Sequence, residues 1–305
     1  VYDRFRARLM FPIRDRRGRV LGFGGRVVTG DGKPKYLNSP ETALFLKSQV
    51  LYGLYEVLQH KRDIARVCVV EGYMDVIGLA QYGIDYSVAT LGTSTSVDHI
   101  KQLIKVTDEI VFCFDGDRAG KAAAWRALLA CLPVMSGKFK VNFLFLPDGE
   151  DPDSIVRSEG SAGFVARLDK TIPLSEVLFN YLSFDVDLTF ADGRALLLDK
   201  LLPLLLQVPD GSYKVLLCDM AAQAAQLSID QIEKQLILLR GSGSKVEREQ
   251  KEEPKYVFSY LDRAISSLLF EPKLALEADI SWIDRADDLK GLGGILVKII
   301  TWIKD

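Results

Sequence analysis

The chain has few of the residues that build zinc sites and disulfide frameworks. Its 305 residues include two histidines and four cysteines, and the cysteines show no paired spacing. Cys68 and Cys113 also fall inside apolar runs that we expect to be strands. The pattern therefore predicts reduced thiols, as in a cytoplasmic protein, and no zinc site in this chain. We assign no role to His60 or His99, which stand apart from each other and from the acidic motifs.

The sequence also lacks a signal peptide and a hydrophobic run long enough to cross a bilayer. The longest candidate, residues 291–303, is short and contains Lys298. We therefore expect no membrane partner. A hydrophobic content of 48% is enough for a sizeable core and for two or three domains. Because the chain begins at Val1 in mid-pattern, we expect it to be part of a longer protein.

Charge is distributed unevenly along the chain, although the net charge is only −2. Residues 1–62 carry a net charge of +8, and the remainder carries −10. This imbalance indicates that the N-terminal part binds polyanions. Arg26, Lys35 and Lys47 are well suited to phosphate groups. For the cluster of Arg14, Arg16, Arg17 and Arg19 we expect only a solvated basic face at a hairpin tip.

Short apolar runs alternate with helix-like segments between residues 67 and 146. The expected strands are 67–70, 87–90, 110–114 and 140–146, and the expected helices are 73–82, 97–104 and 118–131. This alternation predicts an α/β fold with a parallel sheet. Residues 2–29 read as a hairpin and 51–60 as a helix. Helices are also expected at 153–158, 173–182, 192–206, 212–226 and 229–239.

Carboxylates follow two of the expected strands directly. Glu71 follows residues 67–70, and Asp115 and Asp117 follow 110–114. Because the carboxyl ends of parallel strands meet at one edge of the sheet, we expect these side chains to face the same space. Asp75 lies four residues after Glu71, on the same side of the next helix. Crowded carboxylates need a counter-charge, and oxygen ligands alone favour Mg²⁺ or Mn²⁺.

Each acidic residue also has a simpler interpretation. Asp117 precedes a helix and could merely cap it, and Glu71 alone could be a solvated loop residue. Asp151 and Asp153, around Pro152, could be turn and cap residues. The loop at residues 92–96 could bind a phosphate or be an ordinary capped turn.

Two of these segments resemble the signature motifs of the TOPRIM fold of primases and topoisomerases. They are Val-Val-Glu-Gly-Tyr-Met-Asp at residues 69–75 and Phe-Asp-Gly-Asp-Arg-Ala-Gly at residues 114–120. Residues 35–42, 91–95 and 145–153 extend the resemblance to the polymerase domain of DnaG-type bacterial primases, in the expected order. The resemblance covers roughly residues 1–240.

The resemblance implies a magnesium-dependent, DNA-directed RNA polymerase that makes short RNA primers on single-stranded DNA in the primosome. Glu71, Asp115 and Asp117 would hold the metal ions, with Asp75, Asp151 and Asp153 completing the cluster. Arg26, Lys35 and Lys47 would contact template and nucleoside triphosphate, with Tyr36 and Asn38 beside them. A topoisomerase or nuclease of the same fold, and a non-catalytic nucleic-acid-binding or helicase-loading module, remain alternatives.

The resemblance also implies a division of the chain. Residues 1–62 would form the basic N-terminal part of the polymerase domain, 63–158 the TOPRIM core and 159–240 a helical subdomain or bundle. Residues 241–255 would be a linker. Residues 256–305 would begin a helical domain that binds the replicative helicase. The family's zinc-binding domain lies outside this chain.

Overall fold

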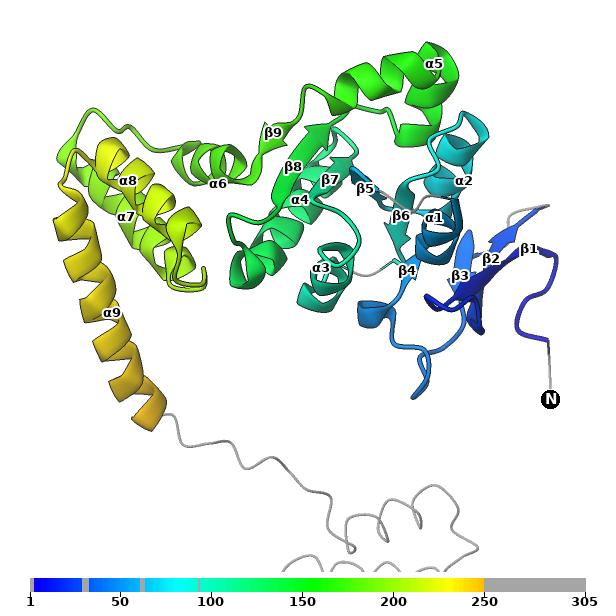
Figure 1. Ribbon diagram of the computed structural model, residues 1–305, viewed down its shortest axis with the longest axis horizontal. Helices are drawn as coiled ribbons and strands as arrows, with labels where there is room; N and C mark the ends of the chain where they lie inside the picture. The colour runs from blue at the N-terminus through cyan, green and yellow to red at the C-terminus, as the bar shows by residue number, and fades with distance from the viewer. Residues whose placement is uncertain (1–2, 29–32, 61–63, 93, 250–305) are drawn as a thin grey trace, which may run out of the picture. The chain divides into compact units, whose positions relative to one another are not determined.

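Two sheets organise the part of the chain that the structure describes. The structure is a computed structural model, and it describes residues 3–28, 33–60, 64–92 and 94–249. The first sheet contains β1 (Arg8–Arg14), β2 (Val20–Val27) and β3 (Tyr36–Asn38), all antiparallel (Figure 1). β1 and β2 form the predicted hairpin, and Gly18, with φ of +83°, lies in its turn. A positive φ of this size favours glycine over other residues.

The second sheet is the predicted parallel sheet, extended at both edges. Its strand order is β4-β6-β5-β7-β8-β9. The central strands β6 (Ser87–Thr90), β5 (Val67–Val70), β7 (Glu109–Phe114) and β8 (Lys140–Phe145) are mutually parallel. The edge strands β4 (Leu51–Tyr52) and β9 (Ile172–Pro173) are antiparallel to their neighbours. The α/β fold is therefore confirmed.

Residues 51–60 differ from the sequence-based prediction of a single helix. Leu51 and Tyr52 pair with β6 as β4, and the helix α1 (Leu54–His60) begins after Gly53. Gly53 has φ of +86°, and a Cβ there would crowd the backbone of Ser87. Glycine thus permits the turn that separates strand from helix. As a result β4 and α1, on the N-terminal side of the expected boundary at residue 62, belong to the second sheet and its core.

Alternate residues of the central strands pack on opposite faces of this sheet. Val67, Val69 and Phe112 are buried with α3 (Val97–Leu103) and α4 (Arg118–Cys131). Cys68 and Val111 face the other way, against α2 (Tyr73–Gln81) and α5 (Pro152–Leu168). Burial of each large apolar side chain stabilises the fold by about 1.5–3 kcal/mol. This covering of both faces explains why the strands are apolar throughout.

A third apolar cluster joins the first sheet to the second. Phe11 and Ile13 of β1 pack near Phe45, Tyr73 and Leu91. The Tyr73 ring lies 4.9 Å from Phe11 and 5.6 Å from the ring of Tyr52. The basic sheet is therefore held against the start of α2, next to the end of β5.

The remaining helices continue the core on the side of α3 and α4. They are α6 (Leu174–Ser183), α7 (Ala191–Leu205), α8 (Ser212–Ala225) and α9 (Ile229–Glu249). α5 is longer than predicted and contains a kink at Gly160, whose φ is 70°. Contacts divide the chain after Arg240 into two units, residues 1–240 and residues 241–305. α9 extends through residues 241–249, where composition predicted a linker; the expected domain at 256–305 lies outside the described residues.

No helix within the described ranges has both the length and the hydropathy needed to cross a membrane.

Candidate active site

The predicted carboxylates meet at the carboxyl edge of the central strands. β5 and β7 are paired in parallel, with Val69 beside Phe112, so Glu71 and Asp115 leave the sheet at neighbouring positions. Partial burial raises the pKa of Glu71, and the negative charges of Asp115 and Asp117 raise it further. Burial also raises the pKa of Asp115, with added effects from Asp151 and Asp117. These side chains therefore act on one another through space, as the strand-end argument predicted.

Asp75 has the most perturbed carboxyl group of this cluster. Burial, together with the charges of Asp151, Asp115 and Asp153, raises its pKa to about 7. The backbone N–H of Gly72 donates to Asp75 Oδ2 over 3.0 Å and opposes this rise. At neutral pH this carboxyl group therefore exchanges between its charged and uncharged forms.

Three of the acidic side chains also have local structural partners. Asp117 Oδ1 accepts from the Gly120 N–H at 2.7 Å and caps α4, and Asp151 Oδ1 accepts from the Ser154 N–H at 2.7 Å and caps α5. Each cap uses one oxygen and leaves the second for another ligand. Asp153 is different, because Arg157 binds both of its carboxylate oxygens at 2.9 Å.

Gly116, between Asp115 and Asp117, lies against the loop after β8. A Cβ at this position would overlap the carbonyl oxygen of Leu146 and the backbone of Pro147. The two aspartates therefore depend on a glycine between them to reach the edge of the sheet. This contact also brings the segment that leads to Asp151 close to the end of β7.

The donor atoms fit a divalent cation, but they do not close around one point. All are carboxylate oxygens, and their crowding raises several of their pKa values, which is the condition that a bound cation relieves. Among the described residues, no three His, Cys, Asp or Glu side chains are arranged closely enough to hold a metal ion. The cluster therefore surrounds a shared space rather than a finished coordination site.

The first sheet places cations and an aromatic ring beside the acidic cluster. On β3, the Tyr36 ring lies 5.5 Å from the Arg26 guanidinium carbon and 5.8 Å from the Lys35 ammonium nitrogen. Burial raises the pKa of Tyr36, Arg26 lowers it, and Asp75 is among the acidic residues that raise it. Tyr36 therefore lies within electrostatic range of Asp75, Asp151 and Asp153, and Arg26 and Lys35 lie beside its ring. Their binding of a phosphate-bearing ligand stays a prediction.

Asn38 and Lys47 are positioned by contacts to the second sheet and to α3. Asn38 Nδ2 donates to the carbonyl of Leu91 at 3.2 Å, while Asn38 Oδ1 is buried and has no hydrogen-bond partner among the described residues. Lys47 begins the 3₁₀ helix η1 (Lys47–Gln49), and its carbonyl lies 2.9 Å from His99 Nε2. In the described part of the chain, no contact links the Lys47 side chain to the carboxylates.

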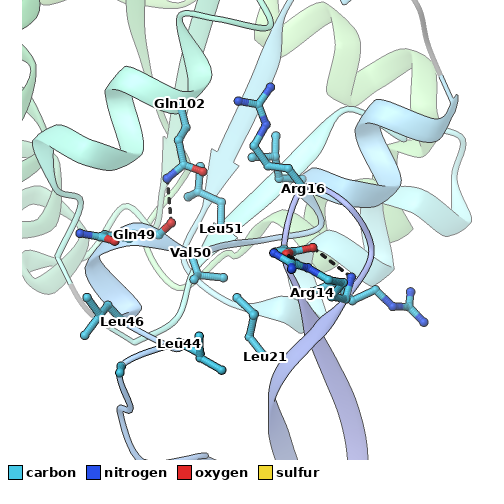
Figure 2. A pocket seen from close by; sticks show the side chains of 13 residues that line it. Arg14, Arg16, Leu21, Leu44, Leu46, Gln49, Val50, Leu51 and Gln102 are labelled. Atoms are coloured by element: carbon cyan, nitrogen blue, oxygen red, sulfur yellow. Dashed lines mark hydrogen bonds and ion pairs between the residues drawn. The ribbon is translucent and has the colours of Figure 1, made fainter.

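Arg16, Arg17 and Arg19 at the hairpin tip are exposed, and Arg14, Arg16 and Arg19 also border a hollow. The hollow has a volume of about 290 Å³. Figure 2 shows Arg14 and Arg16 beside it, together with the apolar lining residues Leu21, Leu44 and Val50. Arg14 pairs with Glu56 at 2.7 Å, and Arg19 pairs with Asp15 at 2.7 Å. Two of the four arginine charges are therefore already compensated.

Sequence reasoning missed two groups at this site. The positive charge of Arg126, on α4, lowers the pKa of Glu71. Tyr73 stands between the sheets, its ring 5.3 Å from that of Tyr36, and burial raises its pKa to about 12. Tyr73 lies inside the first acidic motif, which gave a signal for it. The sequence contained no signal for Arg126, because only the packing of α4 against the sheet brings this residue near Glu71.

Family models match three successive parts of the chain. They are described as the N-terminal domain of the DNA primase catalytic core (residues 1–58), the Toprim domain (65–144) and the DnaB-helicase binding domain of primase (175–230). The last match falls on α6, α7, α8 and the start of α9, before the residues 256–305 that we expected to bind the helicase. That expectation stays a prediction.

Individual relatives agree with these matches. The DNA primase of Escherichia coli K12 is 57% identical over 216 residues, which is 71% of this chain and 37% of the relative. The DNA primase of Pseudomonas aeruginosa is 53% identical over 232 residues, 76% of this chain and 35% of that protein. The chain thus spans little more than a third of the length of these curated relatives.

Solved structures show the same likeness over most of their length. A DNA primase domain from Pseudomonas aeruginosa is 52% identical, has a TM-score of 0.74, and covers 76% of this chain and 73% of its own. A DnaG primase catalytic domain bound to single-stranded DNA is 55% identical and has a TM-score of 0.69. This match covers 73% of this chain and 71% of that structure. With its acidic edge, its basic sheet and these relatives, the chain belongs to the DnaG-type bacterial DNA primases.

Proposed function

We propose that the chain is the catalytic part of a DNA primase, which copies single-stranded DNA into short RNA primers. The observation that carries the proposal is the convergence of Glu71 and Asp115 from two adjacent strands, opposite Arg26 and Lys35. Phosphoryl transfer requires positioned reactants and neutralised charge more than covalent chemistry. An acidic edge facing a basic, aromatic strand offers both.

Mg²⁺ is the proposed cofactor, and Mn²⁺ could take its place. Bound between the carboxylates, it would activate the 3′-hydroxyl of the primer and stabilise the pyrophosphate leaving group. Glu71, Asp115 and Asp117 are the proposed ligands, and Asp151 has one carboxylate oxygen to add. Asp153 could join them only by releasing Arg157. Asp75, with its pKa of about 7, would respond to the metal's charge by losing its proton.

The remaining proposed roles are those of binding the polyanionic substrates. Arg26 and Lys35 bind phosphates of the nucleoside triphosphate or the template, and Tyr36 orients both cations through its ring. Lys47, carried on η1, contacts the template. Asn38 fixes the loop after Leu91 through its Nδ2 group, which donates to the Leu91 carbonyl.

The decisive experiment replaces the paired aspartates. In the double variant Asp115→Asn and Asp117→Asn, we expect primer synthesis on single-stranded DNA to vanish while the protein stays folded. Asp108→Asn is the matched control, because Asp108 precedes β7 at its opposite end. Circular dichroism checks folding, and radiolabelled ribonucleotide incorporation measures synthesis. Persistent synthesis in the double variant would refute the assignment; strand scission without incorporation would favour a topoisomerase or nuclease.

A replicative helicase is the proposed protein partner. Support comes from the match of residues 175–230 to a helicase-binding family. Two locations are open, this helical region and residues 256–305. Titration of a fluorescent helicase with the full chain and with a chain ending at residue 249 separates them. Unchanged affinity places the contact at residues 175–230, and lost affinity places it at residues 256–305.

A further inference from the structure

A second cavity borders α4 and the strands β8 and β9 of the second sheet. It has a volume of about 630 Å³ and lies between α4 and the helices α6 and α7. The residues that matter here are three aromatic side chains of its lining and two lysines: Trp125, Tyr181, Phe184, Lys121 and Lys200. None of them was singled out by the sequence motifs.

The aromatic side chains form a partly exposed platform. The rings of Trp125 and Tyr181 are stacked, with centroids 3.9 Å apart and an angle of 9° between their planes. Tyr181 is 51% exposed and Phe184 is 83% exposed. Residues three apart on a helix lie on the same side, so both rings face the same opening. Trp125 stacks on one face of the Tyr181 ring, and the exposure of Tyr181 leaves part of the ring accessible to a further planar group.

Two positive charges accompany this platform. In the described ranges, neither Lys121 nor Lys200 makes an ion pair with an acidic residue. Among the described residues of the cavity lining, Asp185 is the one acidic residue, so these residues together carry one positive charge. An aromatic ring with an open face and nearby uncompensated cations is the combination that binds single-stranded nucleic acids. The two lysines favour a ligand that carries negative charge over a purely apolar one.

The cavity is close to the acidic edge of the sheet. Asp117 caps α4, and Lys121 and Trp125 follow on the same helix. At a rise of 1.5 Å per residue, Trp125 lies about 12 Å along α4 from Asp117. A stacked strand advances by about 3.4 Å per nucleotide, so three or four nucleotides span this distance. Phe145, another lining residue, pairs with Phe114, which directly precedes Asp115.

We propose that this cavity binds a base of a single-stranded polynucleotide, three or four nucleotides from the acidic edge. The base stacks on the open face of Tyr181, next to Phe184, and Lys121 and Lys200 bind the adjoining phosphates. The strand is either the DNA template or the newly made RNA, which share this chemistry. The site deepens the proposed primase function and rests on it, but its occupancy is measurable without catalysis.

The experiment measures binding of fluorescein-labelled dT20 and rU20 to the full chain by anisotropy. In Tyr181→Ala we expect affinity for at least one of the two to fall fivefold or more, a loss typical of a stacking contact. Loss with dT20 alone identifies the template, and loss with rU20 alone identifies the primer. Tyr181→Phe, which keeps the ring, should retain affinity. Phe190→Ala is the control, because Phe190 is 67% exposed but does not line the cavity.

Two outcomes would overturn the proposal. Unchanged affinity for both oligonucleotides in folded Tyr181→Ala would exclude a stacking site; weaker binding of a protein partner in that variant would then mark the cavity as a protein interface. An equal loss in Tyr181→Phe and Tyr181→Ala would show that the ring is not what binds. Neither result touches the primase assignment, which depends on Asp115 and Asp117 and on incorporation of ribonucleotides.

Discussion

At the scale of single residues, the acidic cluster is a compromise between stability and chemistry. Asp75 illustrates it, because burial and three neighbouring carboxylates raise its pKa from 3.8 to about 7. The folded state holds this proton more tightly than the unfolded chain does. Stability therefore falls as pH rises from about 4 to about 7, where the unfolded chain loses the proton first. A bound cation would reverse the penalty by favouring the charged form.

Asp75→Asn should remove this pH dependence. The amide oxygen can still accept the N–H of Gly72, and no charge remains to be buried. We expect the variant to be more stable than the parent at pH 8, by up to a few kcal/mol, and to match it near pH 4. Urea unfolding at the two pH values measures the difference. Equal stabilisation at both values would show that the charge of Asp75 is not responsible.

Gly116→Ala should disturb the site by contact alone. The added methyl group would overlap the backbone after β8, so Asp115 and Asp117 must shift. We expect a loss of about 1–3 kcal/mol in the free energy of unfolding and a fall in primer synthesis of tenfold or more. Gly83→Ala is a useful comparison, because a Cβ there meets nothing within 4 Å, although its φ of +80° adds backbone strain. If only stability falls in Gly116→Ala, the aspartates tolerate the shift.

Single residues also show what sequence reasoning could reach. Glu71, Asp115 and Asp117 were predictable together, because each follows an apolar strand and parallel strands end on one side. The contact of Arg157 with Asp153 was not predicted. Its binding to both carboxylate oxygens depends on one helix turn of α5 and on the rotamer of Arg157. The stack of Trp125 on Tyr181 was not predictable either, because it joins residues far apart in sequence through α4 and α6.

At the scale of elements, η1 and α3 form one unit through His99. The His99 side chain is fully buried; its Nδ1 accepts from the Ser96 N–H at 3.3 Å and its Nε2 lies 2.9 Å from the Lys47 carbonyl. Gln102 Nε2 adds a bond of 2.7 Å to the carbonyl of Gln49 (Figure 2). Burial lowers the pKa of His99, so the neutral ring is the relevant form. His99 therefore joins η1 to α3 through its buried ring.

His99→Ala should loosen the segment that carries Lys47. Two hydrogen bonds and a buried ring are lost, so we expect the melting temperature to fall by about 2–8 °C. If Lys47 contacts the template, the KM for template should rise while kcat changes little. Lys101→Ala, on the exposed side of the same helix, is the control. A fall in kcat without a change in KM would contradict this positioning role.

Elements were predicted well where their pattern was local. The central strands and α4 could be read from apolar runs and from the cap at Asp117. β4 could not, because its two residues are a strand only through pairing with β6, and Gly53 ends it. The same holds for β9, which exists only through its pairing with β8. Short edge strands depend on a neighbour that the local sequence does not reveal.

At the scale of the whole molecule, opposite charges are divided between the two sheets. The +8 charge of residues 1–62 lies partly on the first sheet, and the acidic cluster lies at the edge of the second. Such a division attracts a polyanion to one side while cations neutralise the other. The charge imbalance could be read from the sequence. The proximity of Tyr36 to Asp75 could not, because it depends on the packing of Tyr73 between the two sheets.

Template binding should weaken with salt in proportion to the phosphates that are neutralised. For single strands, the slope of log affinity against log salt concentration changes by about 0.7 for each phosphate contact. We expect Lys35→Ala and Lys47→Ala each to reduce the slope by about this amount, and Lys138→Ala to leave it unchanged. Anisotropy with dT20 between 50 and 200 mM salt, about the range in which such effects are measured, tests this. An unchanged slope in Lys47→Ala would remove it from the template path.

The strand β4 has a consequence for how such a protein can be rearranged. Because Leu51 and Tyr52 hydrogen-bond to β6, the basic N-terminal part of the chain (residues 1–62) contributes an edge strand to the second sheet. A chimera that exchanged about the first sixty residues as an independent unit would remove β4 and leave the edge of β6 unpaired. Recombination between relatives should accordingly succeed at crossovers placed before Leu51 and fail at those placed just after α1.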